Sequence, residues 1–251
     1  MAQYGFGSGS LWAVPTYTLA GVAVTLPDPV AFGGLQEGHV EFSGNVKELY
    51  GQYAFPLITL PGHRKITGKS KFGQISARAM NLFFGETAAT GEIKAVNGEA
   101  GTVPTTPFKI TVTNSATWTT DLGVVYALTG LPLNRVTTPS AIGQYSCAAG
   151  VYTFDTTDAA ALLKISYAYT AAALPGQLIT INNNLLGLAN FFKVVLNTIV
   201  QGRHMTITLN KCISNKLTLG TKTEDYVIPE FDFAAMADDS GVVGTFSFYS
   251  A

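Results

Sequence analysis

Thr67-Gly68-Lys69-Ser70 comes closer to a catalytic motif than any other segment of this sequence. A phosphate-binding loop ends in Gly-Lys-Ser and leads into a helix, and its backbone amides cradle nucleotide phosphates. Such a loop also needs a glycine five residues before Gly68, and His63 occupies that position. The residues at 64–66 alternate in the manner of a strand, which cannot form the cradle. We therefore interpret the motif as part of a strand, without nucleotide chemistry.

The sequence also lacks the residue patterns of nucleophilic and of metal-assisted catalysis. No serine has glycine at both flanking second positions, as the nucleophile elbow requires. The three histidines, His39, His63 and His204, are far apart, and neither cysteine lies at metal-ligand spacing from them. We predict that the protein is not an enzyme and holds no cofactor and no metal.

The elements that carry these residues follow one another between His39 and Gly85. His39–Val46 alternates polar and apolar residues, which predicts a strand with one buried face. A proline-broken loop follows, and Lys65–Phe72 alternates again. Apolar residues then recur at helical spacing over Ile75–Phe83, and Gly85 is a typical C-terminal stop. We expect strand, loop, strand and one short amphipathic helix.

Short strands separated by turns are predicted for most of the remaining chain. Their spacing is typical of an antiparallel β sandwich or barrel. The clearest apolar runs lie at 108–113, 151–154, 163–170, 178–181, 191–196 and 204–209.

Composition excludes several classes of function. Only 12% of the 251 residues are charged, about half the share of an ordinary soluble domain. A chain so poor in charge hides much of its surface against partners. The net charge of -1 gives no general attraction for nucleic acid or for an anionic membrane. The N-terminus lacks the pattern of a secretory signal, and no uninterrupted apolar run suits a membrane helix of about 20 residues.

Two cysteines leave two alternatives. Cys147 and Cys212 are far apart in sequence and could pair in the fold. Two buried free thiols in a reducing cytoplasm are the favoured interpretation.

Prolines, glycines and charge divide the chain into three parts. Residues 1–34 are predicted to form an N-terminal arm that docks either on its own subunit or on a neighbour. Residues 35–94 and 153–251 are predicted to form one β sandwich. The turn-rich stretch 95–152 is predicted to be a β-rich insertion or lobe.

Several of these segments resemble the tail tube proteins of long-tailed bacteriophages. The resemblance is carried by Lys47–Gln52 with Phe55-Pro56, by Lys65–Lys69 with Phe72-Gly73, and by Thr223–Phe233. It extends from about Leu26 to about Gly244. It implies a mainly β fold, an antiparallel sandwich with one short flanking helix, and assembly into stacked hexameric rings with a continuous inner β-barrel.

The resemblance also implies a function and partners. The subunit would build the channel for genome delivery in a virion tail assembled in the bacterial host cytoplasm. Its partners would be further copies of itself, the tape measure, tail tip and tail terminator proteins, and double-stranded DNA in passage, without a membrane. The alternative is a β-sandwich binding module, such as an adhesin or a carbohydrate-binding domain.

Three carboxylates are candidates for the channel wall. Glu230 and Asp232 share one face of a predicted strand whose other face is phenylalanine, and Glu41 has apolar neighbours on both sides. From Glu224 to the C-terminus there are six acidic residues and no basic one. The other interpretation is a set of ordinary strand faces whose carboxylates meet water.

Lysines and exposed aromatics are candidates for contacts between subunits. The lysines share one strand face, which is either solvated, paired with carboxylates of a neighbour, or in contact with phosphate. A conduit argues against phosphate contact, because repeated lysines would hold sliding DNA. The candidates are Tyr4, Phe6, Trp12, Tyr50, Tyr53, Phe55, Lys65, Lys69 and Lys71.

Overall fold

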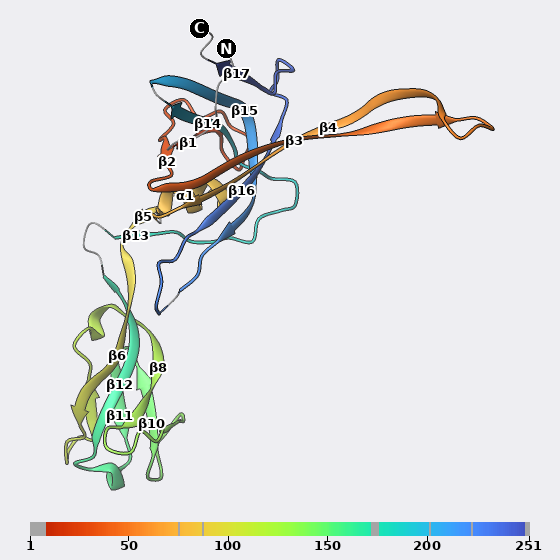
Figure 1. The fold of residues 1–251 in the computed structure, drawn as a ribbon. Helices are drawn as coiled ribbons and strands as arrows, with labels where there is room; N and C mark the ends of the chain where they lie inside the picture. The colour runs from red at the N-terminus through yellow and green to blue at the C-terminus, as the bar shows by residue number, and fades with distance from the viewer. Residues whose placement is uncertain are drawn as a thin grey trace. The chain divides into compact units, whose positions relative to one another are not determined.

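The computed structural model describes residues 9–74, 76–86, 88–171, 176–200, 202–221 and 223–248. The chain divides into two compact units (Figure 1). The main unit comprises Met1–Ala88 and Ile179–Ala251, and the inserted unit comprises Ala89–Leu178. Strands dominate both units, nearly all strand pairs are antiparallel, and the described residues contain one α-helix. The predicted mainly β, antiparallel class is therefore confirmed.

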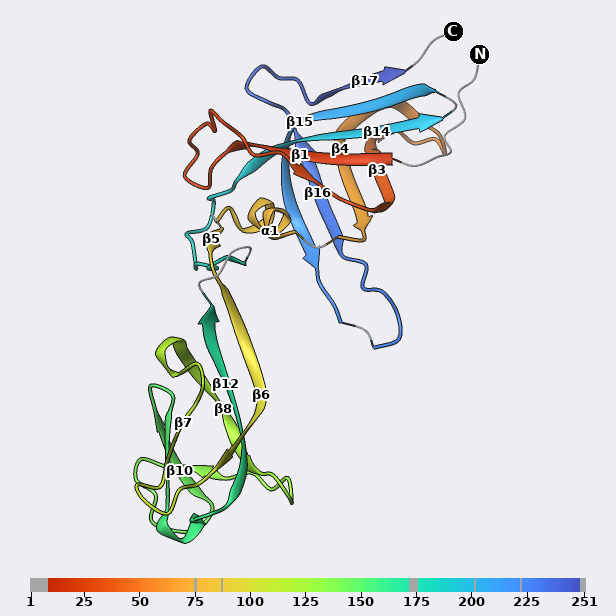
Figure 2. The same ribbon diagram turned by 90° about the vertical axis from the view of Figure 1, so that its left-hand side faces the viewer.

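An eight-stranded sheet forms the main unit. Its order is β2-β1-β14-β15-β16-β4-β3, with β17 beside β15. Figure 2 shows β1, β14 and β15 running side by side. The sheet ends at β2 and β3, so within the described residues it is an open sheet and not a closed barrel. The strands are β1 Gly9–Tyr17, β2 Val30–Ala31, β3 Leu35–Tyr50, β4 Pro56–Phe72, β14 Phe191–Val200, β15 Arg203–Thr218, β16 Glu230–Met236 and β17 Gly244–Phe248.

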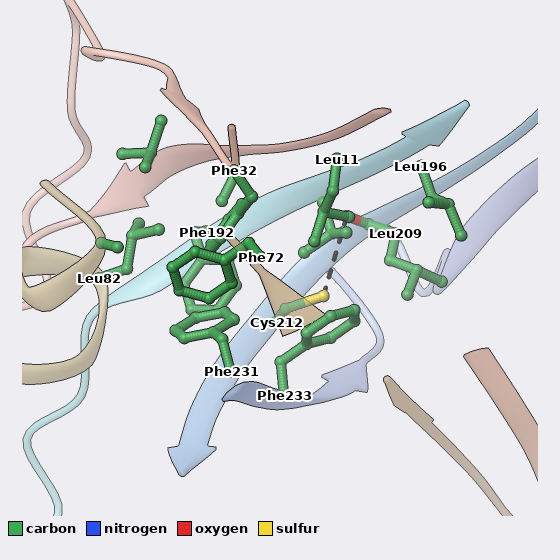
Figure 3. Packing of buried hydrophobic residues seen from close by; sticks show 14 of the residues in the cluster. Leu11, Phe32, Phe72, Leu82, Phe192, Leu196, Leu209, Cys212, Phe231 and Phe233 are labelled. Carbon is green, nitrogen blue, oxygen red and sulfur yellow. Dashed lines mark hydrogen bonds between the residues drawn. The ribbon is translucent and has the colours of Figure 1, made fainter. Parts of the chain in front are cut away.

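Phenylalanines from several strands build the core of the main unit (Figure 3). Phe231 and Phe233 on β16 are almost fully buried, while the acidic residues that alternate with them lie on the opposite face. The Phe32 and Phe72 rings meet edge to face, with centroids 5.0 Å apart. Such contacts add to the free energy gained by removing the rings from water.

The predicted short helix is α1, Ala77–Phe84. The Ser76 side chain accepts a hydrogen bond from the backbone N–H of Arg78, which satisfies one free donor of the first turn. Gly85 ends the helix in the left-handed conformation at φ 72°. Ala79 and Leu82 are buried in the core cluster, so the helix closes one side of it.

The N-terminal segment is not an independent arm over its described part. Residues 9–17 form β1, which pairs with β14 through most of its length. Leu11 and Ala13 are buried in the core. The prediction of a separate arm over 1–34 is therefore wrong for these residues, because alternating apolar side chains place them in the sheet. The alternative, an ordered segment of its own subunit, holds for them.

The inserted unit has a second core between two small sheets. A three-stranded sheet has the order β6-β12-β8, and a four-stranded sheet has the order β7-β11-β10-β9. Tyr145, Tyr152 and Tyr167 are buried together with aliphatic residues between them. The elements are β5 Ala89–Thr90, β6 Glu92–Thr102, β7 Lys109–Thr111, η1 Ser115–Thr117, β8 Trp118–Tyr126, β9 Asn134–Arg135, β10 Gln144–Ala148, β11 Val151–Phe154, η2 Thr156–Asp158, β12 Leu162–Ala171 and β13 Gln177–Leu178.

The inserted unit is longer than the predicted insertion of 95–152. The strand predicted at 163–170 exists as β12, but it pairs with β6 and β8 and not with the main sheet. The prediction that residues 89–94 and 153–178 belong to the main sandwich is therefore wrong. Alternation identifies a strand, whereas its partners are strands that lie far away in the sequence.

The two cysteines lie in different units, and both are free thiols. Cys212 is fully buried in the main core, and burial raises the pKa of its thiol to about 12. This thiol therefore stays protonated and acts as a small apolar side chain.

Candidate assembly surface

A long hairpin of the main unit carries a contiguous set of exposed large apolar side chains. β3 and β4 pair through almost their whole length, and Figure 1 shows them continuing beyond the rest of the sheet. The neighbour of β4 on its other side, β16, pairs with it only over Ile66–Lys71. From Pro56 to Lys65 β4 therefore has a single partner strand, β3.

The proline-broken loop predicted between the strands at His39–Val46 and Lys65–Phe72 is mostly part of this hairpin, so that prediction is wrong. Only Gly51–Phe55 form the turn, and β4 begins at Pro56. Pro61 lies within the strand opposite Val46, next to a register shift between Gly44 and Val46. A proline is tolerated there because a strand at a bulge or an open edge does not need every backbone donor.

Large apolar side chains cover the outer part of the hairpin, which we call the hairpin tip, residues 46–60. Leu49 lies opposite Ile58 in the strand register, and both are more than half exposed. In the turn, Tyr53 is 70% and Phe55 is 82% exposed. Phe42, which precedes the tip on β3, is also half exposed. The buried face predicted for the strand at 39–46 is therefore not buried at this residue. Contiguous exposed apolar surface of this kind marks an interaction site.

Three of the predicted contact aromatics thus lie at the hairpin tip: Tyr50, Tyr53 and Phe55. Trp12 lies elsewhere, on β1, and is 37% exposed on the face opposite Leu11 and Ala13. Tyr4 and Phe6 lie outside the described residues.

Two of the predicted lysines and two of the predicted carboxylates come together on the outer face of the main sheet. Lys69 lies opposite Asp232, and Lys71 lies opposite Glu230, on the neighbouring strands β4 and β16. Lys71 also binds Glu37 with an N–O distance of 2.7 Å. We call this group the charge cluster, and its members are Glu37, Lys69, Lys71, Lys216, Glu230 and Asp232.

Cations and anions balance within the charge cluster. Lys216 Nζ lies 3.1 Å from Glu230, and the hydrogen bond and charge of this lysine lower the pKa of Glu230. The bond and charge of Lys71 likewise lower the pKa of Glu37. Three lysines therefore face three carboxylates in one subunit. Glu230 is paired with Lys216, and Asp232 lies between Lys69 and Lys216 in the strand register, an arrangement that the sequence alone did not predict.

Glu41 and Lys65 lie apart from the charge cluster. Glu41 is exposed on β3 opposite Thr67, and Lys65 is exposed on β4 opposite Ser43. Neither forms an ion pair with a described residue. Among the three predicted channel residues, Glu41 is thus the one whose charge is not matched by a lysine across the register.

Gly68 of the phosphate-loop-like motif has a packing role. A β carbon built on it would come 2.1 Å from the Phe233 ring. The glycine lets this buried ring (Figure 3) lie flat against β4. The motif is part of a strand, as predicted, and the glycine is explained by the phenylalanine on β16.

Two buried carboxylates of the inserted unit were not anticipated from the sequence. Asp121 accepts hydrogen bonds from the hydroxyls of Tyr145 at 2.8 Å and Tyr152 at 3.0 Å. Asp158 accepts a hydrogen bond from Tyr126 at 2.5 Å and another from the backbone N–H of Gly143. Each carboxylate is satisfied by tyrosines in its own core, so the arrangement specifies the fold and does not leave a free acid.

The described residues contain neither a metal-binding cluster nor a membrane-spanning helix. None of their histidines, cysteines or acids gather in threes that could hold a metal ion. No helix among them has the length and apolarity needed to cross a membrane. Comparison of the chain with protein-family models and with curated proteins gave no match.

Proposed function

We propose that this protein is the subunit of a bacteriophage tail tube, which assembles into stacked hexameric rings that form the channel for genome delivery. The observation that carries the proposal is the hairpin tip, an exposed apolar surface on an element held by a single partner strand. The sequence resemblance of Lys47–Gln52 and Thr223–Phe233 supplies the family.

The physical argument begins with the cost of this surface in water. Each large apolar side chain that stays exposed forgoes about 1.5–3 kcal/mol that burial would contribute. Leu49, Ile58 and Leu60 share one face of the hairpin tip, and none of them reaches a core cluster of its own chain. A second copy that covers the tip would recover this free energy.

Open strand edges support the same proposal. β3 is the last strand of the main sheet and has no partner on its outer side within the described residues, whereas β1 at the other side is paired with the short β2 and bridged to Ala23 at Tyr17. Unpaired edges bind further strands unless they are covered. In the proposed ring, edges of neighbouring subunits pair and close an inner β-barrel.

The charge cluster refines the proposed channel. Because lysines lie beside Glu230 and Asp232, these two carboxylates contribute less to the repulsion of DNA. Residues without a lysine opposite them, such as Glu41, would contribute more. A near-neutral wall still avoids the strong salt-dependent binding that a ring of free lysines would produce. The expected partners are the tape measure, tail tip and tail terminator proteins, with the assembled tail as the location.

Sedimentation and electron microscopy test the proposal together. We expect the purified protein, seeded with tail tips if needed, to form rings and tubes. Replacing Leu49, Ile58 and Leu60 by threonine should abolish the tubes and leave a folded monomer. The control replaces three aliphatic residues of the inserted unit that are even more exposed, Leu128, Leu131 and Ile142, and should assemble normally. A wild-type protein that stays monomeric under all these conditions contradicts the proposal.

The alternative, a carbohydrate-binding or adhesin module, predicts an exposed aromatic platform. In the inserted unit, the large apolar side chains described as exposed are all aliphatic. The exposed aromatics lie on the main unit, mostly at the hairpin tip and on β17, with Trp12, Phe42 and Tyr226 at other places. This distribution favours protein contacts over sugar stacking.

A further inference from the structure

We propose that the hairpin tip of one copy docks into an apolar hollow at the base of the hairpin of another copy. This inference rests on the proposed self-assembly and names the two surfaces that meet. The hollow has a volume of about 620 Å³ and is lined by apolar side chains with two cations at its rim. Those that carry the argument are Phe42, Ile66, Met236, Val243, Arg64 and Lys65.

The hollow exists because three strands diverge. β15 pairs with β16 from Lys211 to Thr218 and with β17 from Met205 to Leu209. β4 stays beside β16 only as far as Ile66 and then leaves with the hairpin. A wedge therefore opens between β17 and the base of the hairpin. The Phe42 and Phe246 rings, with centroids 5.0 Å apart, meet at this wedge.

The tip cannot fill the hollow of its own chain. Phe42 lines the hollow and Tyr50 ends β3, so eight residues separate them along a continuous strand. A strand advances about 3.3 Å per residue, which places the turn roughly 25 Å from the hollow. A tip that docks in the hollow must therefore belong to another copy.

The two surfaces match in chemistry. The tip offers aromatic anchors, Tyr53 and Phe55, and a hollow of this size falls within the range of about 300–1,000 Å³ that accepts such groups. Arg64 and Lys65 at the rim form no ion pair with a described residue. Glu48 is the one acid of the tip, accepts a hydrogen bond from the Tyr50 hydroxyl and forms no ion pair with a described residue, although Lys47 precedes it in the chain. Docking brings this carboxylate to the rim cations.

The geometry of such a contact explains how assembly continues. Tip and hollow lie at different places on the same subunit, so each docked copy still presents a free tip or a free hollow. Contacts of this head-to-tail kind generate closed rings or open helical filaments. A tip-to-tip contact would stop at a dimer.

Disulfide trapping between separately purified variants tests the inference. In a Cys147→Ser background, one protein carries Tyr53→Cys at the tip and the other carries Met236→Cys at the hollow. We expect mild oxidation of the mixture to shift the band on a non-reducing gel to the mass of a dimer. The matched control pairs Tyr53→Cys with Leu128→Cys on the inserted unit and should stay monomeric.

Charge reversal adds a second readout. Glu48→Arg should abolish trapping, and Arg64→Glu with Lys65→Glu on the partner should restore it. Wild-type tubes without any tip-to-hollow dimer would overturn this inference and leave the proposed function intact. A dimer in the Tyr53→Cys sample alone would also overturn it, because tips would then meet tips. Trapped dimers from a protein that forms no tubes would support the docking and contradict the tail tube function.

Discussion

Lys69 on β4 lies directly opposite Asp232 on β16, at the centre of the charge cluster. Glu230 and Lys71 form the next pair along the same two strands. On the other side of β16, Lys216 lies opposite Asp232 in the register of β15. Residues that look like two separate sets in the sequence, one basic and one acidic, therefore lie side by side on neighbouring strands.

A double-mutant cycle should detect the Lys69–Asp232 pair. We expect Lys69→Gln and Asp232→Asn to show a coupling of about 0.2–1 kcal/mol in the free energy of unfolding, falling as salt screens the pair. Urea unfolding followed by Trp12 fluorescence in a Trp118→Phe background reports on the main unit. The control cycle of Lys65→Gln with Asp232→Asn should show no coupling, since Lys65 lies opposite Ser43. Equal coupling in both cycles would contradict the assignment of the pair.

Gly68→Ala should destabilise the main unit by about 1–3 kcal/mol, because the added methyl group overlaps the buried Phe233 ring. The same urea unfolding assay measures the change. Phe233→Leu should be less harmful in the Gly68→Ala background than in the wild type, because the smaller side chain makes room. Gly73→Ala is the matched control, since a β carbon there meets nothing closer than 3.6 Å. A neutral Gly68→Ala would contradict this packing explanation.

Alternating polar and apolar residues were sufficient to predict the strand around Phe231, and apolar residues at helical spacing were sufficient to predict the helix before Gly85. Neither period could predict where the core stops. Val40 and Phe42 continue the alternation of a buried face, yet Phe42 is half exposed because β3 has left the sheet core by then. Pro56 and Pro61 indicated a loop, whereas an edge strand tolerates both.

For the charge cluster, the sequence was sufficient to predict the residues on each strand face. It could not predict which residues of the two strands lie opposite each other. Periodicity places Lys69 and Glu230 each on a strand face, but the register that brings the two strands together is a long-range property. The same holds for Asp158, which lies in a polar stretch of the sequence and is 2% exposed in the fold.

Tyr126→Phe should destabilise the inserted unit by about 1–3 kcal/mol, because Asp158 would lose a donor while staying buried. Urea unfolding followed by Trp118 fluorescence in a Trp12→Phe background reports on this unit. Tyr169→Phe serves as the control, since that hydroxyl is not part of the Asp158 or Asp121 networks. If both substitutions cost the same, the hydrogen bond to Asp158 is not what stabilises this core.

Glu99 should make the inserted unit sensitive to acid. Burial by itself raises the pKa of this carboxyl, but hydrogen bonds from Tyr167 and Thr113 outweigh burial and lower the pKa overall. A lowered pKa in the folded state contributes stability above the unfolded value of about 4.3, and this stability is lost as the pH falls through the folded value. The thermal midpoint of the inserted unit should therefore drop as the pH falls below about 5 and continue to drop through the lowered pKa that Glu99 has in the folded state.

Glu99→Gln should flatten this drop, because a neutral amide has no proton to gain. Tyr167→Phe should flatten it partly, since one of the donors that lower the pKa of Glu99 is removed. Thermal unfolding of both variants, read by Trp118 fluorescence in the Trp12→Phe background, compares the slopes with that of the parent. An unchanged acid slope in Glu99→Gln would assign the acid sensitivity to other carboxylates, such as Asp155, whose pKa is lowered by hydrogen bonds from Thr157.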